Sequence, residues 1–190
     1  MPRTARIVLI LATALALASV GCVGFSVNMD YDPDTDFSGF RSWYWLPPSP
    51  TGDPRIDNDL VANRVRRAVE HSLAARGYVK TSTGEGDFGV GYHGFIEGKI
   101  DVQTVDRYYG YGPGWGRYGM GYGGVGTETY VDQYDEGTLI LDIVDNRSRK
   151  LVWRGSTSAR VRENDSPKNR DERTQKAVDA ILAEFPPEKS

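Results

Sequence analysis

Hydrophobic and polar residues alternate near the start of this chain in a pattern that predicts strands. Large apolar residues occupy every second position between residues 25 and 31, namely Phe25, Val27, Met29 and Tyr31. The acidic stretch 32–36, which contains Pro33, is expected to end this strand. A second short strand is predicted at 43–46, where Trp-Tyr-Trp-Leu precedes two prolines.

The spacing of apolar residues changes to that of a helix over residues 54–76. Apolar side chains recur there every three or four positions, at Leu60, Val61, Val65, Ala68, Val69 and Leu73. Asp53 followed by Pro54 predicts an N-cap with proline at the first helical position. Gly77 is expected just past the helix end, because glycine tolerates the left-handed backbone found there.

Residues 87–105 carry the clearest strand pattern in the chain. Their even positions hold apolar or aromatic residues, namely Phe88, Val90, Tyr92, Ile96, Ile100 and Val102. Most odd positions are polar or charged, so one face of this strand is expected to be buried and the other wet. Gly94 and Gly98 fall inside the run and predict a bulge or bend.

The segment 108–126 has a different composition, since nine of the 17 residues from 110 to 126 are glycine. Such a segment loses much backbone entropy on ordering and has few side chains to offset the loss, which predicts a mobile loop. Exposed tyrosine and tryptophan can stack on sugars or pack at protein interfaces. The aromatic residues therefore define a possible interaction loop, made of Tyr111, Trp115, Tyr118 and Tyr122. The alternative is a low-complexity insertion without a partner.

After this loop the pattern predicts strand at 127–134 and a buried strand at 139–144. A hairpin turn at 145–148 joins the buried strand to its second arm at 151–162. The polar stretch 163–169 is expected to be a loop.

A second helix is predicted from residue 170 to residue 184, before the prolines at 186 and 187. The element order is therefore strands, helix, strands, helix. Hairpin connections favour a largely antiparallel sheet, and a helix with one apolar stripe packs on a sheet face. The chain is expected to fold at 23–190 as a single α+β domain with two layers, in which two helices pack on one face of the sheet.

Residues 1–21 have the plan of a signal peptide. Arg3 and Arg6 are followed by an apolar run, 7–18, which is shorter than the roughly 20 residues of a membrane-spanning helix. The ending Ser-Val-Gly-Cys resembles the lipobox of bacterial lipoproteins, in which the signal is cut just before a cysteine that becomes lipidated. Cys22 is thus the expected lipidation site, for acyl chains such as palmitate, and 22–36 comprises the anchor and the first strand region. The alternative is a plain signal peptide with an incidental cysteine.

The expected localisation is the outer membrane, facing the periplasm. Several acyl chains hold a protein firmly, since each buried methylene contributes about 0.8 kcal/mol. Val23 follows the cysteine, where an aspartate would resemble the signal for retention in the inner membrane. The membrane is therefore one expected partner, reached through the N-terminal lipid.

Composition and charge exclude several classes of function. The chain has 26 acidic and 23 basic residues, and a net charge of −3 does not suit a nucleic-acid partner. One cysteine excludes an intramolecular disulfide, and two histidines, His71 and His93, provide no spacing typical of a metal site. No metal and no cofactor are expected.

The chemical motifs in the sequence are weak. G-x-G-x-x-G occurs from Gly89, Gly114 and Gly119, but none of these matches joins a strand to a helix as a dinucleotide site requires. The alternating aspartates at 30–36 lack the glycine and glutamate of an EF-hand loop, which favours a solvated turn over a weak calcium site. No G-x-S-x-G nucleophile motif is present.

Six blocks together resemble one bacterial family in their order and spacing. They are 36–46 (DFSGFRSWYWL), 74–78 (AARGY), 87–93 (DFGVGYH), 137–145 (GTLILDIVD), 151–155 (LVWRG) and 185–187 (FPP). The family is the group of lipoproteins classified as domain of unknown function 4136, and the resemblance covers nearly all of the chain after residue 22. It implies an exported, usually lipid-anchored α+β domain, and it implies no active-site residues. The loop at 108–126 is longer and more glycine-rich than the resemblance implies.

These patterns lead us to expect a non-enzymatic lipoprotein that works as a binding or envelope-assembly module, with envelope proteins or peptidoglycan as partners. The alternative is a small-ligand carrier that holds a lipid or glycan in the cleft between helices and sheet. A hydrolase that uses dispersed carboxylates is a third reading, and it would require a perturbed acidic pair.

Overall fold

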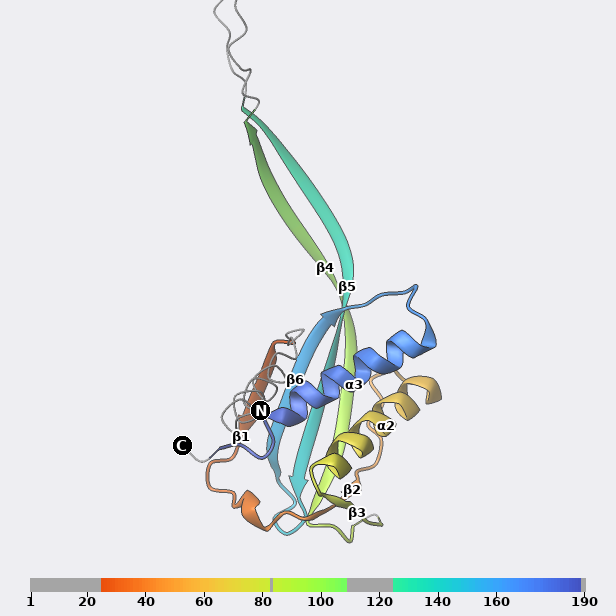
Figure 1. Ribbon diagram of the computed structural model, residues 1–190, viewed down its shortest axis with the longest axis vertical. Helices are drawn as coiled ribbons and strands as arrows, with labels where there is room; N and C mark the ends of the chain where they lie inside the picture. Colours follow the sequence, from red (N-terminus) through yellow and green to blue (C-terminus); the bar gives the residue numbers. More distant parts are fainter. Residues whose placement is uncertain (1–24, 83, 109–124, 189–190) are drawn as a thin grey trace, which may run out of the picture.

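The computed structural model describes residues 25–82, 84–108 and 125–188, and its side chains are described outside 103–129. In these residues, six strands form one sheet and two α-helices accompany it (Figure 1). The elements are β1 (Val27–Tyr31), the 3-10 helix η1 (Phe37–Gly39), β2 (Ser42–Trp45), α2 (Asp59–Ala75), β3 (Val79–Lys80), β4 (Phe88–Tyr108), β5 (Val125–Asp145), β6 (Leu151–Arg160) and α3 (Pro167–Ala183). The predicted α+β class is confirmed.

The sheet has the order β1-β6-β5-β4-β2-β3. The three ladders that join β1, β6, β5 and β4 are antiparallel, as the hairpin patterns predict. The two ladders that add β2 and β3 are parallel. Parallel neighbours need a crossover connection, and α2 provides it between β2 and β3.

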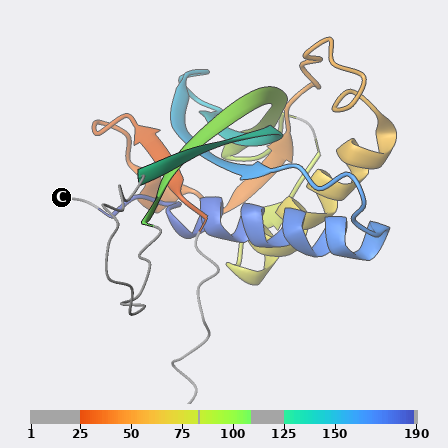
Figure 2. The same cartoon turned by 90° about the horizontal axis from the view of Figure 1, so that it is seen from above.

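Both helices lie on the same side of the sheet (Figure 2). Arg64 of α2 pairs with Asp171 of α3, and the Ser72 hydroxyl of α2 contacts the Asp179 carboxylate of α3. In both contacts the partners are 107 residues apart in sequence, so the two helices run parallel to each other. Their N-terminal ends therefore lie at the same end of the helical layer.

An aromatic cluster fills the space between the sheet and the C-terminal ends of the helices. Phe185, which follows α3, lies with its ring centroid 5.3 Å from Trp153 and 5.6 Å from Phe88. Phe37 of η1 reaches the same ring at 6.0 Å. These contacts bring η1, β4, β6 and the end of α3 onto one core, whose large fully buried members also include Trp43 and Leu73.

The predicted first helix starts five residues later than expected, at Asp59. Its N-cap is Asn58, whose side chain accepts a hydrogen bond from Val61 N at 3.0 Å. Asp53 caps a preceding turn instead, because its carbonyl accepts from Ile56 N and Asp57 N. The prediction at the other end is confirmed, since Gly77 has a φ of 86° and completes a Schellman motif.

The predicted second helix starts earlier than expected, at Pro167. Ser166 is its N-cap and accepts from Asn169 N at 3.2 Å, with Pro167 in the first turn. The loop predicted at 163–169 is therefore wrong for its last three residues. The Ser-Pro pair was the available signal, because proline suits the first helical turn.

β5 is one continuous strand, whereas the pattern predicts two pieces, 127–134 and 139–144. It pairs with β4 at every position from Phe88↔Asp145 to Tyr108↔Val125. The pattern predicts a bulge or bend at Gly94 and Gly98; both residues keep this register, so the bulge is wrong, and the one register shift in the β5–β6 ladder lies at Ile143/Val144. The predicted loop 108–126 overlaps both strands at its ends, and residues 109–124 lie outside the described residues.

The prediction of one buried face along residues 87–105 holds only for the first half of β4. Phe88 and Val90 are buried under the helices, but Ile100 and Val102 have exposed fractions of 62% and 57%. Met29 of the edge strand β1 is also 42% exposed. Alternation identifies which residues share a face, and a neighbouring layer is still required to bury that face.

Gly155 of β6 allows α3 to approach the sheet, and we predict that Gly155→Ala destabilises the fold by about 1–3 kcal/mol. A Cβ there would lie 2.6 Å from Ile181 Cγ2 and in contact with the Trp153 ring, and both side chains are fully buried. Urea unfolding followed by circular dichroism measures the change.

The matched control is Gly39→Ala, where no atom lies within 4 Å of the added Cβ. We expect a change within about 0.5 kcal/mol there. Equal effects of the two substitutions would show that the approach of α3 does not depend on Gly155.

Candidate functional site

A cleft of about 460 Å³ lies between the sheet and the N-terminal halves of the two helices. Val61 and Val65 of α2 and Ala177 of α3 contribute from the helices. The sheet contributes Tyr92, Gly94 and Ile96 of β4, Gly137 and Leu139 of β5, and Ala159 of β6. Its volume is in the range of small-molecule sites, and most of these walls are apolar.

Small residues recur among those that line the cleft. Gly94, Gly137, Ala159 and Ala177 occupy positions between the layers, whereas Trp43, Phe88, Trp153 and Phe185 fill the opposite end. The space next to the glycines is limited, since a Cβ on Gly94 would lie 3.2 Å from Ile56 Cγ2 and one on Gly137 would lie 3.3 Å from Val161 Cγ2. The glycines therefore let Ile56 and Val161 approach the strands at the border of the cleft.

Arginines are frequent among the residues that line the cleft. Six of these residues are arginine and two, Asp135 and Glu163, are acidic; the arginines are Arg55, Arg64, Arg160, Arg162, Arg170 and Arg173, of which Arg160 directs its guanidinium to Tyr134 and Asp132. Several are paired, as Arg173 is with Asp165 at 2.7 Å. A hydrogen bond to Asp53 raises the pKa of Arg55.

Two of these arginines have no carboxylate partner in the described part of the chain, namely Arg162 and Arg170. Arg170 Nη2 donates to the Glu163 carbonyl at 2.6 Å, which brings this guanidinium beside the backbone that follows Arg162. Both side chains belong to exposed residues. The opening thus carries two cations that form no ion pair in the described part of the chain, and the carboxylate residue Glu163 lines the cleft beside them.

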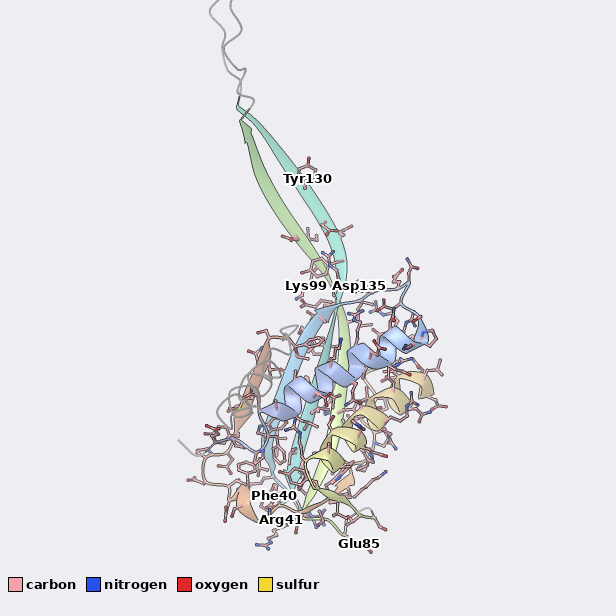
Figure 3. The ribbon with its side chains drawn as sticks, in the orientation of Figure 1. Phe40, Arg41, Glu85, Lys99, Tyr130 and Asp135 are labelled. Atoms are coloured by element: carbon pink, nitrogen blue, oxygen red, sulfur yellow. The ribbon has the colours of Figure 1, made fainter. Side chains whose placement is uncertain are left out.

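The second notable feature is an arm made by the outer halves of β4 and β5, residues 98–108 and 125–135. The β5–β6 ladder ends at Glu136↔Arg160, so beyond it the two strands have only each other as ladder partners. Figure 1 shows this ribbon extending well past the helices. In Figure 3, Lys99 and Asp135 mark its base and Tyr130 lies farther out. Asp135 is held by Arg55 at 3.1 Å.

The two faces of the arm differ in chemistry. Val102 and Val131 lie opposite each other and share a face with Ile100, and all three are more than half exposed. The other face includes Tyr134 and Asp132, which are both contacted by Arg160. Its guanidinium lies 4.0 Å from the Tyr134 ring and 2.8 Å from an Asp132 oxygen. The arm therefore presents an apolar strip on one side and paired charges on the other.

The predicted interaction loop cannot be placed, because Tyr111, Trp115, Tyr118 and Tyr122 lie outside the described residues. The strands that lead into and out of it end at the far end of the arm (Figure 1). The predicted signal peptide 1–21 and Cys22 also lie outside the described residues. No helix in the described residues has the length and apolar character needed to span a membrane.

A buried carboxylate lies on the sheet face away from the helices. Asp142 is 6% exposed and accepts from Arg154 Nε at 2.6 Å and Nη2 at 2.8 Å. His93 Nε2 lies 3.2 Å from the same carboxylate. The hydrogen bond to Asp142 raises the pKa of Arg154. These contacts cross-link β4, β5 and β6, and sequence reasoning missed them because their partners are far apart along the chain.

The other chemical candidates are placed as follows. His71 is exposed on α2, as the pattern predicts, whereas His93 is half-buried. Gly89, Gly91 and Gly94 lie within β4, so this glycine motif does not connect a strand to a helix. Asp32 organises a turn, with Asp34 N donating to its carboxylate at 3.1 Å. Among the described residues, no three histidine, cysteine, aspartate or glutamate side chains are grouped to hold a metal ion.

Comparison with known proteins supports the sequence resemblance. The model of the family described as Domain of unknown function (DUF4136) matches residues 27–187. No curated protein matches the chain. The fold is similar to the crystal structure of a PDZ domain protein from Parabacteroides distasonis, with a TM-score of 0.54 and 13% identity. That match covers 95% of this chain, which spans only 40% of the other protein.

Two further solved structures are similar at lower scores. One is the PelC dodecamer from Paraburkholderia phytofirmans, with a TM-score of 0.44, 12% identity, and coverage of 84% of this chain and 96% of the other. The other is a neuraminyllactose-binding hemagglutinin homolog from Helicobacter pylori, with a TM-score of 0.35, 12% identity, and coverage of 80% and 88%. At such identities the likeness concerns the fold alone.

We predict that Asp142→Asn destabilises the fold by about 2 kcal/mol, because it weakens two charge-assisted hydrogen bonds to Arg154. Asp132→Asn is the matched control. Its pair with Arg160 is exposed on both sides, so its loss is expected to cost less than about 1 kcal/mol. Chemical denaturation of both variants measures the difference, and equal losses would contradict a structural role for the Asp142 cluster.

Proposed function

The chain belongs to the family described as Domain of unknown function (DUF4136), and from that premise we propose that it is a lipid-anchored binding module of the bacterial envelope. In this proposal residues 1–21 direct export and Cys22 carries the lipid. The folded body then faces the periplasm from the outer membrane. Support comes from the lipobox-like ending at Cys22, the only cysteine of the chain.

The observation that carries the binding role is the arm. A two-stranded ribbon is marginally stable in water unless another layer covers it. This ribbon nevertheless extends beyond the body and exposes Ile100, Val102 and Val131 on one face. Exposed apolar surface of this kind is typical of interaction sites. We propose that the apolar strip of the arm packs against an envelope protein.

A binding role suits the chemistry of the described residues better than catalysis does. The buried carboxylate of Asp142 has both oxygens engaged by Arg154. A general acid or base must be free to reach a substrate proton. The two open features, cleft and arm, instead offer apolar surface with charge at the margins, which suits recognition.

A second candidate function is a carrier of small amphipathic ligands, and the cleft is the observation that favours it. It is hollow, apolar and bordered by arginines. The two functions use different residues, so each can be tested while the other is left intact.

We predict that replacing Ile100, Val102 and Val131 together by serine reduces capture of the envelope partner at least tenfold. The reason is loss of the apolar strip, and fold stability should change little because all three side chains are largely exposed. The measurement is photo-crosslinking from residue 133 in living cells, followed by mass spectrometry.

The control is Leu60→Ser on α2, since Leu60 is an exposed apolar residue (76%) away from the arm. It should leave crosslinking unchanged. Undiminished crosslinks in the triple variant would contradict docking at the strip.

We predict that the mature chain isolated from its host carries acyl chains on Cys22 and partitions into detergent, whereas a Cys22→Ser chain produced without residues 1–21 stays in the aqueous phase. Because the chain has one cysteine, a thioether-linked lipid has only one possible site. Intact mass spectrometry of both forms provides the measurement. A mature wild-type chain with a free thiol would rule out the anchor.

A further inference from the structure

We infer that the cleft binds a single-chain amphipathic anion, that is, an alkyl chain ending in a carboxylate, sulfate or phosphate. This inference deepens the carrier function proposed above. The described chain provides an apolar chamber for the tail and, for the head, two guanidinium groups that form no ion pair with another described residue.

The tail site is formed by both layers. Val61 and Val65 approach from α2, Ala177 from α3, and Tyr92 and Leu139 from the sheet. An alkyl chain in this space would cover these apolar side chains. Burial of apolar surface is worth roughly 25 cal/mol per Å², so the tail is expected to provide most of the affinity.

The head site lies at Arg162 and Arg170. The other arginines that line the cleft form ion pairs with carboxylates. Arg64 pairs with Asp171, and Arg173 pairs with Asp165. Arg162 and Arg170 have no such partner in the residues described here. A guanidinium pairs with carboxylate, sulfate or phosphate through charge-assisted hydrogen bonds.

Helix direction adds to this preference. Because α2 and α3 run parallel, both N-termini lie at the cleft end of the layer, where Val61 and Arg170 line the opening. The N-terminal end of a helix carries partial positive charge. The cleft thus favours an anion, although the whole chain has a net charge of −3.

An acyl chain on Cys22 is the second possible source of an alkyl group, because Phe25, three residues later, also lines the cleft. Ester, amide and thioether linkages of such a lipid carry no charge, so they would leave Arg162 and Arg170 unused. The arginines therefore favour a free anion, and the experiment separates the two sources.

The test uses the mature chain with Cys22→Ser and two probes that differ only in head charge, dodecanoate and dodecyltrimethylammonium, each below its micellar concentration. Isothermal titration calorimetry should show dodecanoate binding at least tenfold more tightly than the ammonium compound. Equal affinities, or no binding of dodecanoate, would overturn the proposal.

Two variants assign the halves of the site. Arg162→Gln with Arg170→Gln should remove the preference for dodecanoate and leave binding of uncharged dodecanol unchanged. The matched control is Arg147→Gln with Lys150→Gln, which makes the same charge change at the β5–β6 turn, outside the cleft.

Ala177→Trp should fill the chamber and weaken the binding of dodecanoate, dodecyltrimethylammonium and dodecanol at least tenfold, with circular dichroism confirming the fold. Persistence of the head preference in the double arginine variant would overturn the assignment.

The acylated chain from the host completes the experiment. It should bind dodecanoate as tightly as the Cys22→Ser chain does. If only the Cys22→Ser chain binds, the cleft is occupied by the protein's own acyl groups, and the assignment to a free anion is wrong. Absence of acylation on Cys22 would end the anchor proposal without affecting the result for the cleft.

Discussion

The difference in rise between a strand and a helix determines the layout of this molecule. β4 and β5 have 21 residues each, and α2 and α3 have 17. At about 3.4 Å per residue the strands extend roughly 70 Å, while at about 1.5 Å per residue the helices extend roughly 26 Å. Two such helices cannot cover the length of these strands. The same face of the sheet is therefore packed at one end, partly covered in the middle and bare beyond.

Side-chain size along this face of the sheet changes with the extent to which the helices cover it. Aromatic residues such as Phe88 and Trp153 fill the packed end, where Phe185 closes the core. Glycine and alanine follow in the middle, at Gly137 and Ala159, where the sheet borders the cleft. Large apolar residues return on the arm, at Ile100, Val102 and Val131, where no described layer meets them. These exposed apolar side chains distinguish the arm from a hairpin whose two faces are both polar.

Sequence patterns were sufficient for those features that depend on neighbours along the chain. Alternation identified the shared face of Phe88, Val90 and Tyr92, and Gly77 marked the end of α2. Helix starts were mistaken because several capping residues compete locally, as Asp53 and Asn58 do. The cleft could not be predicted, since it joins residues from strands and helices far apart in sequence, and the Asp142 cluster depends on the strand registers that place His93, Asp142 and Arg154 side by side. Alternation also could not reveal that the helices end before Ile100.

The cleft and the strip are parts of one surface, and this limits how independent their functions can be. The β4–β5 register places Tyr92, Ile96, Ile100 and Val102 on the same face of the ladder. Ile96 lies at the boundary, lining the cleft on one side and leading to the arm on the other. Because the β5–β6 ladder ends at Glu136↔Arg160, the proposed head site at Arg162 lies at the base of the arm, and the tail would run from there into the cleft, away from Ile100. The two sites therefore meet at the base of the arm, where a bound head group and a partner docked on the strip would be neighbours.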